Sequence, residues 1–131
     1  MENYNVVLFG EAEKGEYQTA YFCQTLTDLV EHFGNPPSNS MGLFFAVQAL
    51  LYKRSLVFFR VKEEGFSHPD YLSGINVLQN QKIISDIAAI CLPGVGDSII
   101  IHAVTPVCDR FHSILVTTEA DFYDYISGMT I

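Results

Sequence analysis

The stretch "LPGVGDS" at residues 92–98 has the composition of a loop that could hold a phosphate, because two glycines stand between two apolar runs. Backbone N–H groups at the start of a helix can bind an anion. The stretch, however, contains no Lys, lacks the GxxxxGK[ST] spacing, and has Ile99 where GxGxxG needs its third glycine. Asp97 would repel an anion and would itself cap a helix. The pattern therefore predicts a turn and a helix cap, with a phosphate or nucleotide site as the alternative.

Carboxylates also follow three predicted strands, at Glu63, Asp97 and Glu119. The carboxyl ends of parallel strands meet at one edge of a sheet, where ligands of open α/β sheets bind. Three carboxylates with oxygen-bearing neighbours could hold Mg²⁺. Acidic residues are also common at helix starts because they interact favourably with the helix dipole. We therefore predict no metal and no cofactor, with an acidic crevice for a metal ion or small ligand at these three residues as the alternative.

Residues that could act as nucleophiles lack the surroundings that catalysis needs. Ser98 and Cys91 lie in no nucleophile-elbow sequence, and His102, one helical turn after Ser98, is weak support for a catalytic pair. The four histidines show no HxxxH or HxH spacing. Cys23, Cys91 and Cys108 lie in apolar runs without a CxxC pair, which predicts buried, unreactive thiols. We assign no catalytic residue and expect a non-enzymatic domain.

Aromatic residues in the last segment, 119–128, are candidates for a protein contact. Helical spacing places Phe122, Tyr125 and Ile126 on one face, which is typical of a helix packed on a core. Tyr123 lies off that face, and exposed aromatic residues favour interfaces. The interface candidates are therefore Tyr123, Phe122 and Tyr125, with core packing of the inner face as the alternative.

The elements that must position these residues alternate along the chain. Short apolar, β-branched or aromatic runs predict strands at 5–9, 19–23, 55–61, 86–92 and 113–118. Capped or periodic segments predict helices at 25–34, 43–52, 68–81, 97–110 and 119–128. This alternation predicts one domain over residues 1–131. Its fold class is an α/β three-layer sandwich, with a mainly parallel central sheet flanked by helices and right-handed crossovers.

Three of the predicted helices carry specific expectations. Thr25, Asp28 and Gly34 provide the cap, the dipole partner and the stop of the first helix. The helix at 43–52 is apolar at nearly every position, so we expect it to be buried between layers. Pro106 lacks an N–H group and is expected to kink or shorten the helix that contains it.

The overall composition excludes some classes of partner. The chain has 131 residues, of which 49% are hydrophobic and 17% charged, and its formal net charge is -8. The excess of acid argues against nucleic acid, whose binding needs clustered Lys and Arg. Because the sequence shows no signal peptide and no long apolar span, we expect a cytoplasmic protein without a membrane contact. The high apolar content leaves protein partners, including self-association, as the expected contacts.

Several segments, taken in order over roughly residues 20–120, resemble the central α/β region of contractile tail sheath proteins from phages and related injection systems. They are "TLTDLVEHFGNP", "FFAVQALLYKRSLVFFRVKEEG", "DYLSGINVLQNQKIISDIAAICLPGV" and "AVTPVCDRFHSILV". The resemblance implies a structural assembly subunit, in which Pro93–Gly94 closes a core strand and Arg110–Phe111 enters the next. We expect the extended terminal arms of that family to be absent, and "TTEAD" stands where the family has "DPP". We therefore expect a sheath-like domain that acts through protein contacts and does not form a full sheath by itself.

Overall fold

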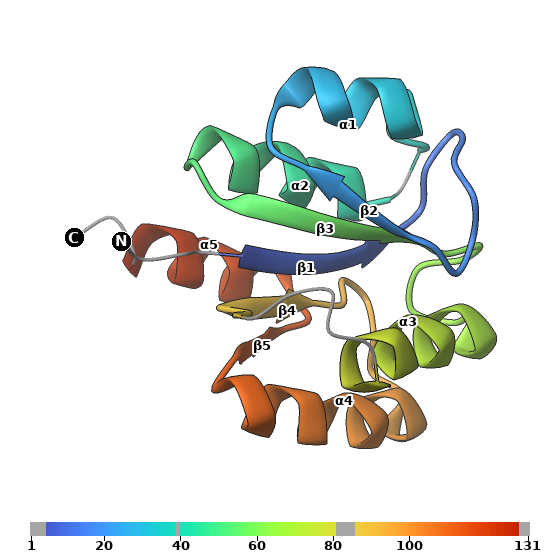
Figure 1. Ribbon diagram of the computed structural model, residues 1–131, viewed down its shortest axis with the longest axis vertical. Coiled ribbons are helices and arrows are strands. Elements are labelled where there is room, and N and C mark those ends of the chain that lie inside the picture. The colour runs from blue at the N-terminus through green and yellow to red at the C-terminus, as the bar shows by residue number, and fades with distance from the viewer. Residues whose placement is uncertain (1–4, 39, 81–85, 129–131) are drawn as a thin grey trace.

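Five strands form one sheet in the order β2-β3-β1-β4-β5 in the computed structural model, which describes residues 5–38, 40–80 and 86–128 (Figure 1). The strands are β1 (Asn5–Gly10), β2 (Ala20–Cys23), β3 (Ser55–Arg60), β4 (Ala89–Cys91) and β5 (Ile114–Val116). All neighbouring pairs are parallel except β2 and β3, which pair antiparallel at one edge. The prediction of a mainly parallel sheet is confirmed.

Helices cover both faces of this sheet, which makes the predicted three-layer sandwich (Figure 1). The helices are α1 (Leu26–Phe33), α2 (Gly42–Leu51), α3 (His68–Asn80), α4 (Ser98–Phe111) and α5 (Glu119–Gly128). One core cluster joins α1, α2 and α5 to one face of the sheet, and a second joins α3 and α4 to the other face. Every predicted element is present with ends shifted by at most three residues, apart from the predicted helix end at 81, which lies outside the described residues.

The central strand β1 supplies both cores in alternation. Val6 and Leu8 belong to the cluster under α1, α2 and α5, whereas Val7 and Phe9 belong to the cluster under α3 and α4. All four side chains are fully buried. A strand covered on both faces needs apolar residues at consecutive positions, which explains the unbroken apolar run at the start of the sequence.

Two local predictions about helix ends have different outcomes. The backbone N–H of Asp28 donates to Oγ1 of Thr25 (3.1 Å), and the N–H of Thr25 donates to Oδ2 of Asp28 (3.3 Å), so the predicted cap of α1 is confirmed. Of the two effects predicted for Pro106, the shortening of its helix is wrong, because α4 continues to Phe111, and the kink stays a prediction. Pro106 lies on the exposed side of α4, where water can bind the carbonyl of His102 that loses its N–H partner.

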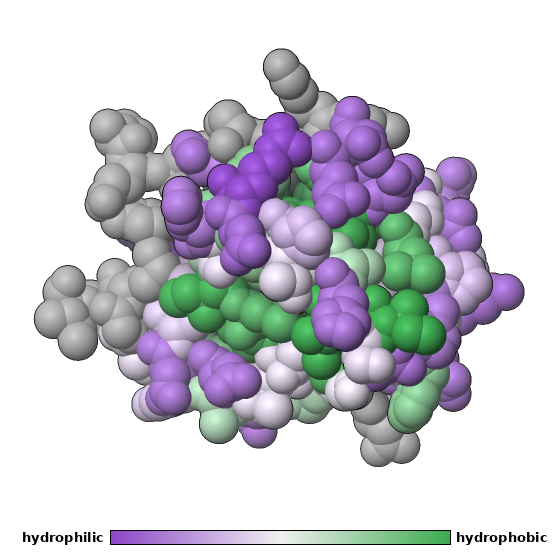
Figure 2. All heavy atoms as spheres, turned by 90° about the horizontal axis from the view of Figure 1, so that it is seen from below, coloured by the Kyte–Doolittle hydropathy of each residue, from purple (hydrophilic) through white to green (hydrophobic). Residues whose placement is uncertain are grey.

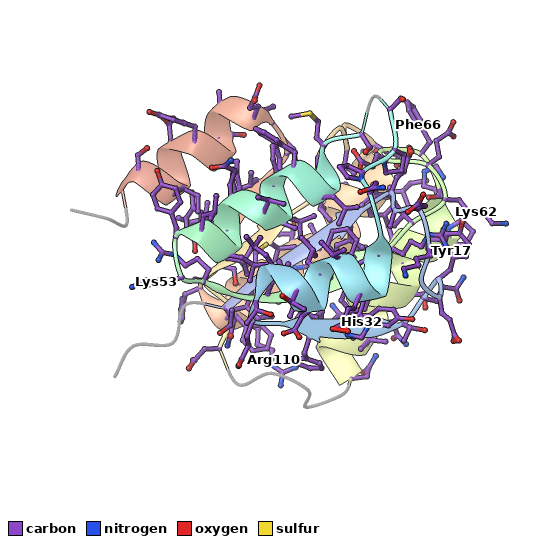
Figure 3. The ribbon with its side chains drawn as sticks, turned by 90° about the horizontal axis from the view of Figure 1, so that it is seen from above. Tyr17, His32, Lys53, Lys62, Phe66 and Arg110 are labelled. Atoms are coloured by element: carbon purple, nitrogen blue, oxygen red, sulfur yellow. The ribbon has the colours of Figure 1, made fainter. Side chains whose placement is uncertain are left out.

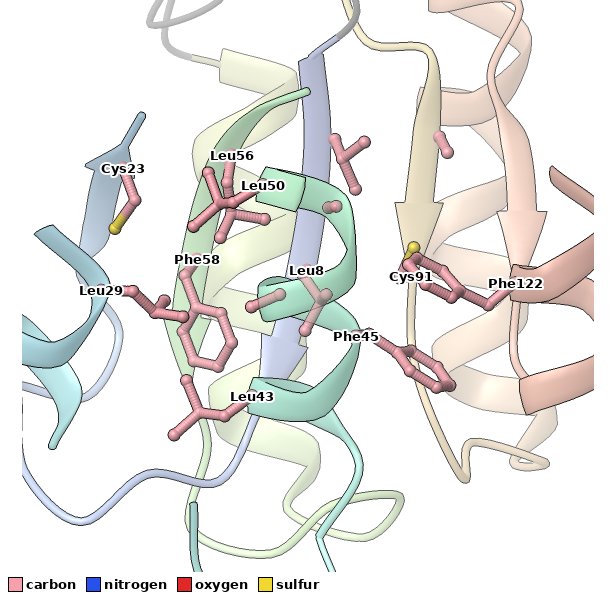
Figure 4. Packing of buried hydrophobic residues seen from close by; sticks show 14 of the residues in the cluster. Leu8, Cys23, Leu29, Leu43, Phe45, Leu50, Leu56, Phe58, Cys91 and Phe122 are labelled. Atoms are coloured by element: carbon pink, nitrogen blue, oxygen red, sulfur yellow. The ribbon is translucent and has the colours of Figure 1, made fainter. Parts of the chain in front are cut away.

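The prediction that α2 is buried on all sides is also wrong. Its inner face packs into the core through Leu43, Phe45 and Leu50 (Figure 4), whereas 44% of Phe44 and 58% of Leu51 are exposed. The sheet offers α2 only one surface, and α1 and α5 cover only part of the rest. Apolar side chains therefore remain on the outer face of α2.

Candidate functional site

The carboxyl edge of the sheet is occupied by the protein's own side chains. Glu64, which follows β3, reaches the N-terminus of α2, where its Oε1 accepts a hydrogen bond from the N–H of Met41 (2.8 Å). Its Oε2 accepts hydrogen bonds from the N–H groups of Gly42 (2.9 Å) and Glu11 (2.9 Å). A helix N-terminus would offer these N–H groups to a bound anion. Here the carboxylate of Glu64 takes that position.

Close backbone contacts pack the loops at this edge against one another. A Cβ atom at Gly10 would lie 2.6 Å from Cα of Gly42, and one at Gly65 would lie 2.6 Å from the carbonyl oxygen of Gly94. Gly94, within "LPGVGDS", has a φ of 79° and donates its N–H to the carbonyl of Thr117 (3.1 Å). The stretch is therefore a corner that holds three loops together, which agrees with the predicted turn.

Asp97 links the two helices of one layer. Its side chain accepts a hydrogen bond from the N–H of Ile99 (2.8 Å), which confirms the predicted cap of α4, and its Oδ2 lies 2.9 Å from Nε2 of His68 at the start of α3. The hydrogen bond with His68, together with the one from Ile99, lowers the pKa of Asp97. Asp97 thus has a structural role between α3 and α4.

The acidic crevice considered for Glu63, Asp97 and Glu119 does not form. Glu63 is exposed in the loop after β3, Asp97 is paired with His68, and Glu119 lines a hollow between α2 and α5. Over residues 5–38, 40–80 and 86–128, no three His, Cys, Asp or Glu residues gather in a way that could hold a metal ion. Asp97 caps α4 and Glu119 begins α5, and these two helices cover opposite faces of the sheet.

The cysteine thiols are shielded to different degrees. Cys23 and Cys91 are fully buried, as predicted, whereas Cys108 is only partly buried. Burial, with a smaller contribution from the charge of Asp28, raises the pKa of Cys23 to about 11. Burial also raises the pKa values of Cys91 and Cys108 above the ordinary range. A thiol that stays protonated at neutral pH is a poor nucleophile.

A groove lies between α2 and α5 on the surface of the protein. Its volume is about 210 Å³, and a second hollow of about 490 Å³ continues it past the start of α2. The groove is lined by Phe44, Gln48, Tyr52, Glu119, Phe122, Tyr123 and Ile126. Phe122 stacks on Phe45 with ring centroids 4.4 Å apart, so this pair joins the two helices beneath the groove. The outer side chains of α2 and α5 thus enclose a largely apolar surface.

The aromatic residues predicted as interface candidates divide between surface and core. Tyr123 is 69% exposed at the groove, whereas Phe122 and Tyr125 are buried. The burial of Phe122 and Tyr125 agrees with the core-packing alternative. Phe44 of α2 and Tyr52, the residue that follows α2, were not among the interface candidates. A helix with more apolar residues than one face can bury was the signal that could have identified them.

Hydrophobic side chains also reach the surface on the layer of α3 and α4, which Figure 2 shows as a green band between hydrophilic residues. Among the exposed hydrophobic residues of these two helices, Ile99 in the first turn of α4 is 59% exposed and Leu72 of α3 is 37% exposed.

None of the helices within 5–38, 40–80 and 86–128 combines the length and the apolar character that crossing a membrane requires. No protein-family model, no curated protein and no solved structure matches this chain.

Proposed function

We propose that this chain is a non-enzymatic protein-interaction domain that binds a partner in the groove between α2 and α5. The observation that carries this proposal is the exposure of Phe44, Tyr52 and Tyr123 around one hollow. Aromatic residues are enriched at the centres of interfaces, where they supply most of the binding energy. The same residues on a free surface would leave apolar area in water without any compensating contact.

The exposed area of these three aromatic side chains is large enough to anchor a partner. The exposed parts of three aromatic side chains amount to about 300 Å², taking about 200 Å² for each whole side chain and about half of it exposed. At about 25 cal/mol per Å², covering them contributes about 7 kcal/mol before the costs of association are subtracted. Additional contacts along the second hollow would add to this gain.

The resemblance to contractile tail sheath cores gives the proposal a more specific form. It implies that the chain is a structural subunit and that its partner belongs to the same assembly. This form of the proposal rests on the order of the sequence segments that resemble the family. The groove supports binding of a protein partner with or without that identity.

Site-specific photo-crosslinking in cells tests the proposal. We would place p-benzoylphenylalanine at Tyr123, which lines the groove, and as the matched control at Leu72, a partly exposed residue of α3 on the opposite layer. We expect an adduct with one defined protein from position 123 and none from position 72, and we expect Phe44→Ala to abolish it. No adduct from position 123, or equal adducts from both positions, would contradict the proposal.

A further inference from the structure

The helices of the layer that contains the groove carry acidic residues but no Lys or Arg. Helices α1, α2 and α5 contain five acidic residues and no Lys or Arg. The acidic residues are Asp28, Glu31, Glu119, Asp121 and Asp124. Glu119 lines the groove and its continuation, while Asp121 and Asp124 lie on the β5 side of α5, where they line another hollow. An occupant of the groove therefore meets an apolar floor bordered by one carboxylate, Glu119, on a helix that carries two further acidic residues outside the groove.

The Lys and Arg residues of the described ranges lie beside or away from the groove, and Lys53 is the direct neighbour of the groove residue Tyr52. The guanidinium of Arg60 lies 4.4 Å from the ring centre of Tyr17 and donates to carbonyls of the loop before β2. Arg110 donates to the carbonyl of Gln79 on the opposite layer (2.8 Å). Figure 3 shows Lys53 just beyond the C-terminal end of α2 and Lys62 near Tyr17. No Lys or Arg among the described residues lines the groove.

We propose that the occupant of the groove is an amphipathic helix of a partner protein, with Lys or Arg flanking its apolar face. This inference rests on the proposed function and specifies the chemistry of the partner. Recognition of a helix in a groove uses apolar anchors at i, i+3 or i+4, and i+7. The two helices that border the groove have ten residues each, which corresponds to about 15 Å. That length matches three such anchors.

Charge also decides against a second copy of this chain as the occupant. The net charge of each copy is -8, and contact through the groove would bring the Glu119 carboxylates and the acidic α5 helices of two copies together. Like charges facing each other across an interface disfavour association, whereas a basic helix would gain both affinity and association rate. The same net charge disfavours an anionic membrane surface or a nucleic acid.

Three synthetic peptides test the charge and the helical pattern separately. Each has 18 residues and a fluorescent label. The first has Leu at i, i+3, i+4 and i+7 positions and Lys elsewhere, the second has the same Leu pattern with Glu in place of Lys, and the third is a scrambled version of the first without helical periodicity. Fluorescence anisotropy gives the Kd of each peptide for the intact chain.

We expect the first peptide to bind at least tenfold more tightly than either of the others, with an affinity that falls as NaCl rises from 50 to 500 mM. Phe44→Ala and Tyr123→Ala should weaken its binding at least tenfold, and Glu119→Gln a few-fold, while Leu72→Ala on the opposite layer leaves it unchanged. Circular dichroism confirms that each variant is folded, which is expected because these side chains are exposed or line the groove.

Three results would overturn this inference: equal binding of the first and second peptides, equal binding of the first and third, or binding that Phe44→Ala does not change. Sedimentation that shows a dimer disrupted by Tyr123→Ala would identify a second copy as the occupant and would overturn it too. If an adduct from position 123 still forms in cells after such a result, the proposed function survives and only the basic helix is wrong. If neither experiment gives binding, both proposals fall.

Discussion

Replacing Glu64 with Ala removes one carboxylate that accepts hydrogen bonds from three backbone N–H groups. Two of these belong to Met41 and Gly42 at the start of α2, and the third belongs to Glu11 after β1. Met41, the residue that precedes α2, supplies no capping side chain of its own. Glu64→Ala would therefore leave the first turn of α2 and the end of β1 without their acceptor.

The expected cost follows from the number of bonds and their exposure. A hydrogen bond to a charged group contributes about 1.5–3 kcal/mol when it is buried. Since Glu64 is only partly buried, water can replace part of each bond, and we expect a loss of about 3 kcal/mol for all three. The free energy of unfolding of such a domain is about 5–15 kcal/mol, so the loss corresponds to a fall in Tm of about 10 °C. Glu64→Gln keeps one oxygen acceptor and should lose less.

Urea unfolding followed by far-UV circular dichroism measures this loss. The matched control is Glu63→Ala, which removes the neighbouring carboxylate, exposed and without these three bonds, and should change the free energy of unfolding by less than about 0.5 kcal/mol. A loss below about 1 kcal/mol for Glu64→Ala, or a loss equal to that of the control, would refute the inference that the three hydrogen bonds of Glu64 stabilise the fold.

Three further predictions concern packing and titration. Gly10→Ala should destabilise the fold by about 2 kcal/mol, because the new Cβ would lie 2.6 Å from Cα of Gly42. Gly96→Ala is the control and should leave the free energy of unfolding unchanged in the same assay, because a Cβ there would meet no atom within 4 Å. Equal effects of the two substitutions would contradict the contact between Gly10 and Gly42. The raised pKa of Cys23 favours the protonated thiol in the folded state, so the free energy of unfolding should fall as pH rises from 9.0 toward about 11. Cys23→Ala should show a smaller fall over that range. An unchanged fall would count against the burial of this thiol. The lowered pKa of Asp97 means that its stabilising contribution is present above its unfolded pKa of about 3.9 and is lost as pH falls below it. The difference in stability between the wild type and Asp97→Asn should therefore shrink from pH 5 to pH 3, and a difference independent of pH would disprove this linkage.

Most of the helices and strands were predictable from short sequence patterns such as helix caps and apolar runs. The cap and stop of α1 depend on residues that lie within ten positions of one another, and Thr25, Asp28 and Gly34 act there as expected. The apolar run at 5–9 predicted a strand, which β1 confirms, and its side chains alternate between the two cores. Such signals are readable because their partners are close in the sequence or follow a fixed period.

The candidate site depends on contacts between residues that are far apart in the sequence, and no local sequence pattern encodes such contacts. The carboxylate of Glu64 meets Glu11 across 53 positions and Gly42 across 22, so its role as a cap was not predictable from the residues around it. The carboxylates of Asp97 and Glu119 were grouped because both follow strands. They separate because their helices cover opposite faces of the sheet.

The amino-acid sequence by itself determined the alternation of strands and helices, the caps, the acidic charge and the surplus of apolar residues in 43–52, because these are properties of composition and short-range periodicity. Only the tertiary structure decided which of those apolar residues stay on the surface. A sheet and two neighbouring helices can cover one side of α2 but not the other, so Phe44 and Tyr52 stand beside Tyr123 from a helix more than sixty residues later in the chain. That juxtaposition creates the groove, and it follows from the packing of layers rather than from any single segment.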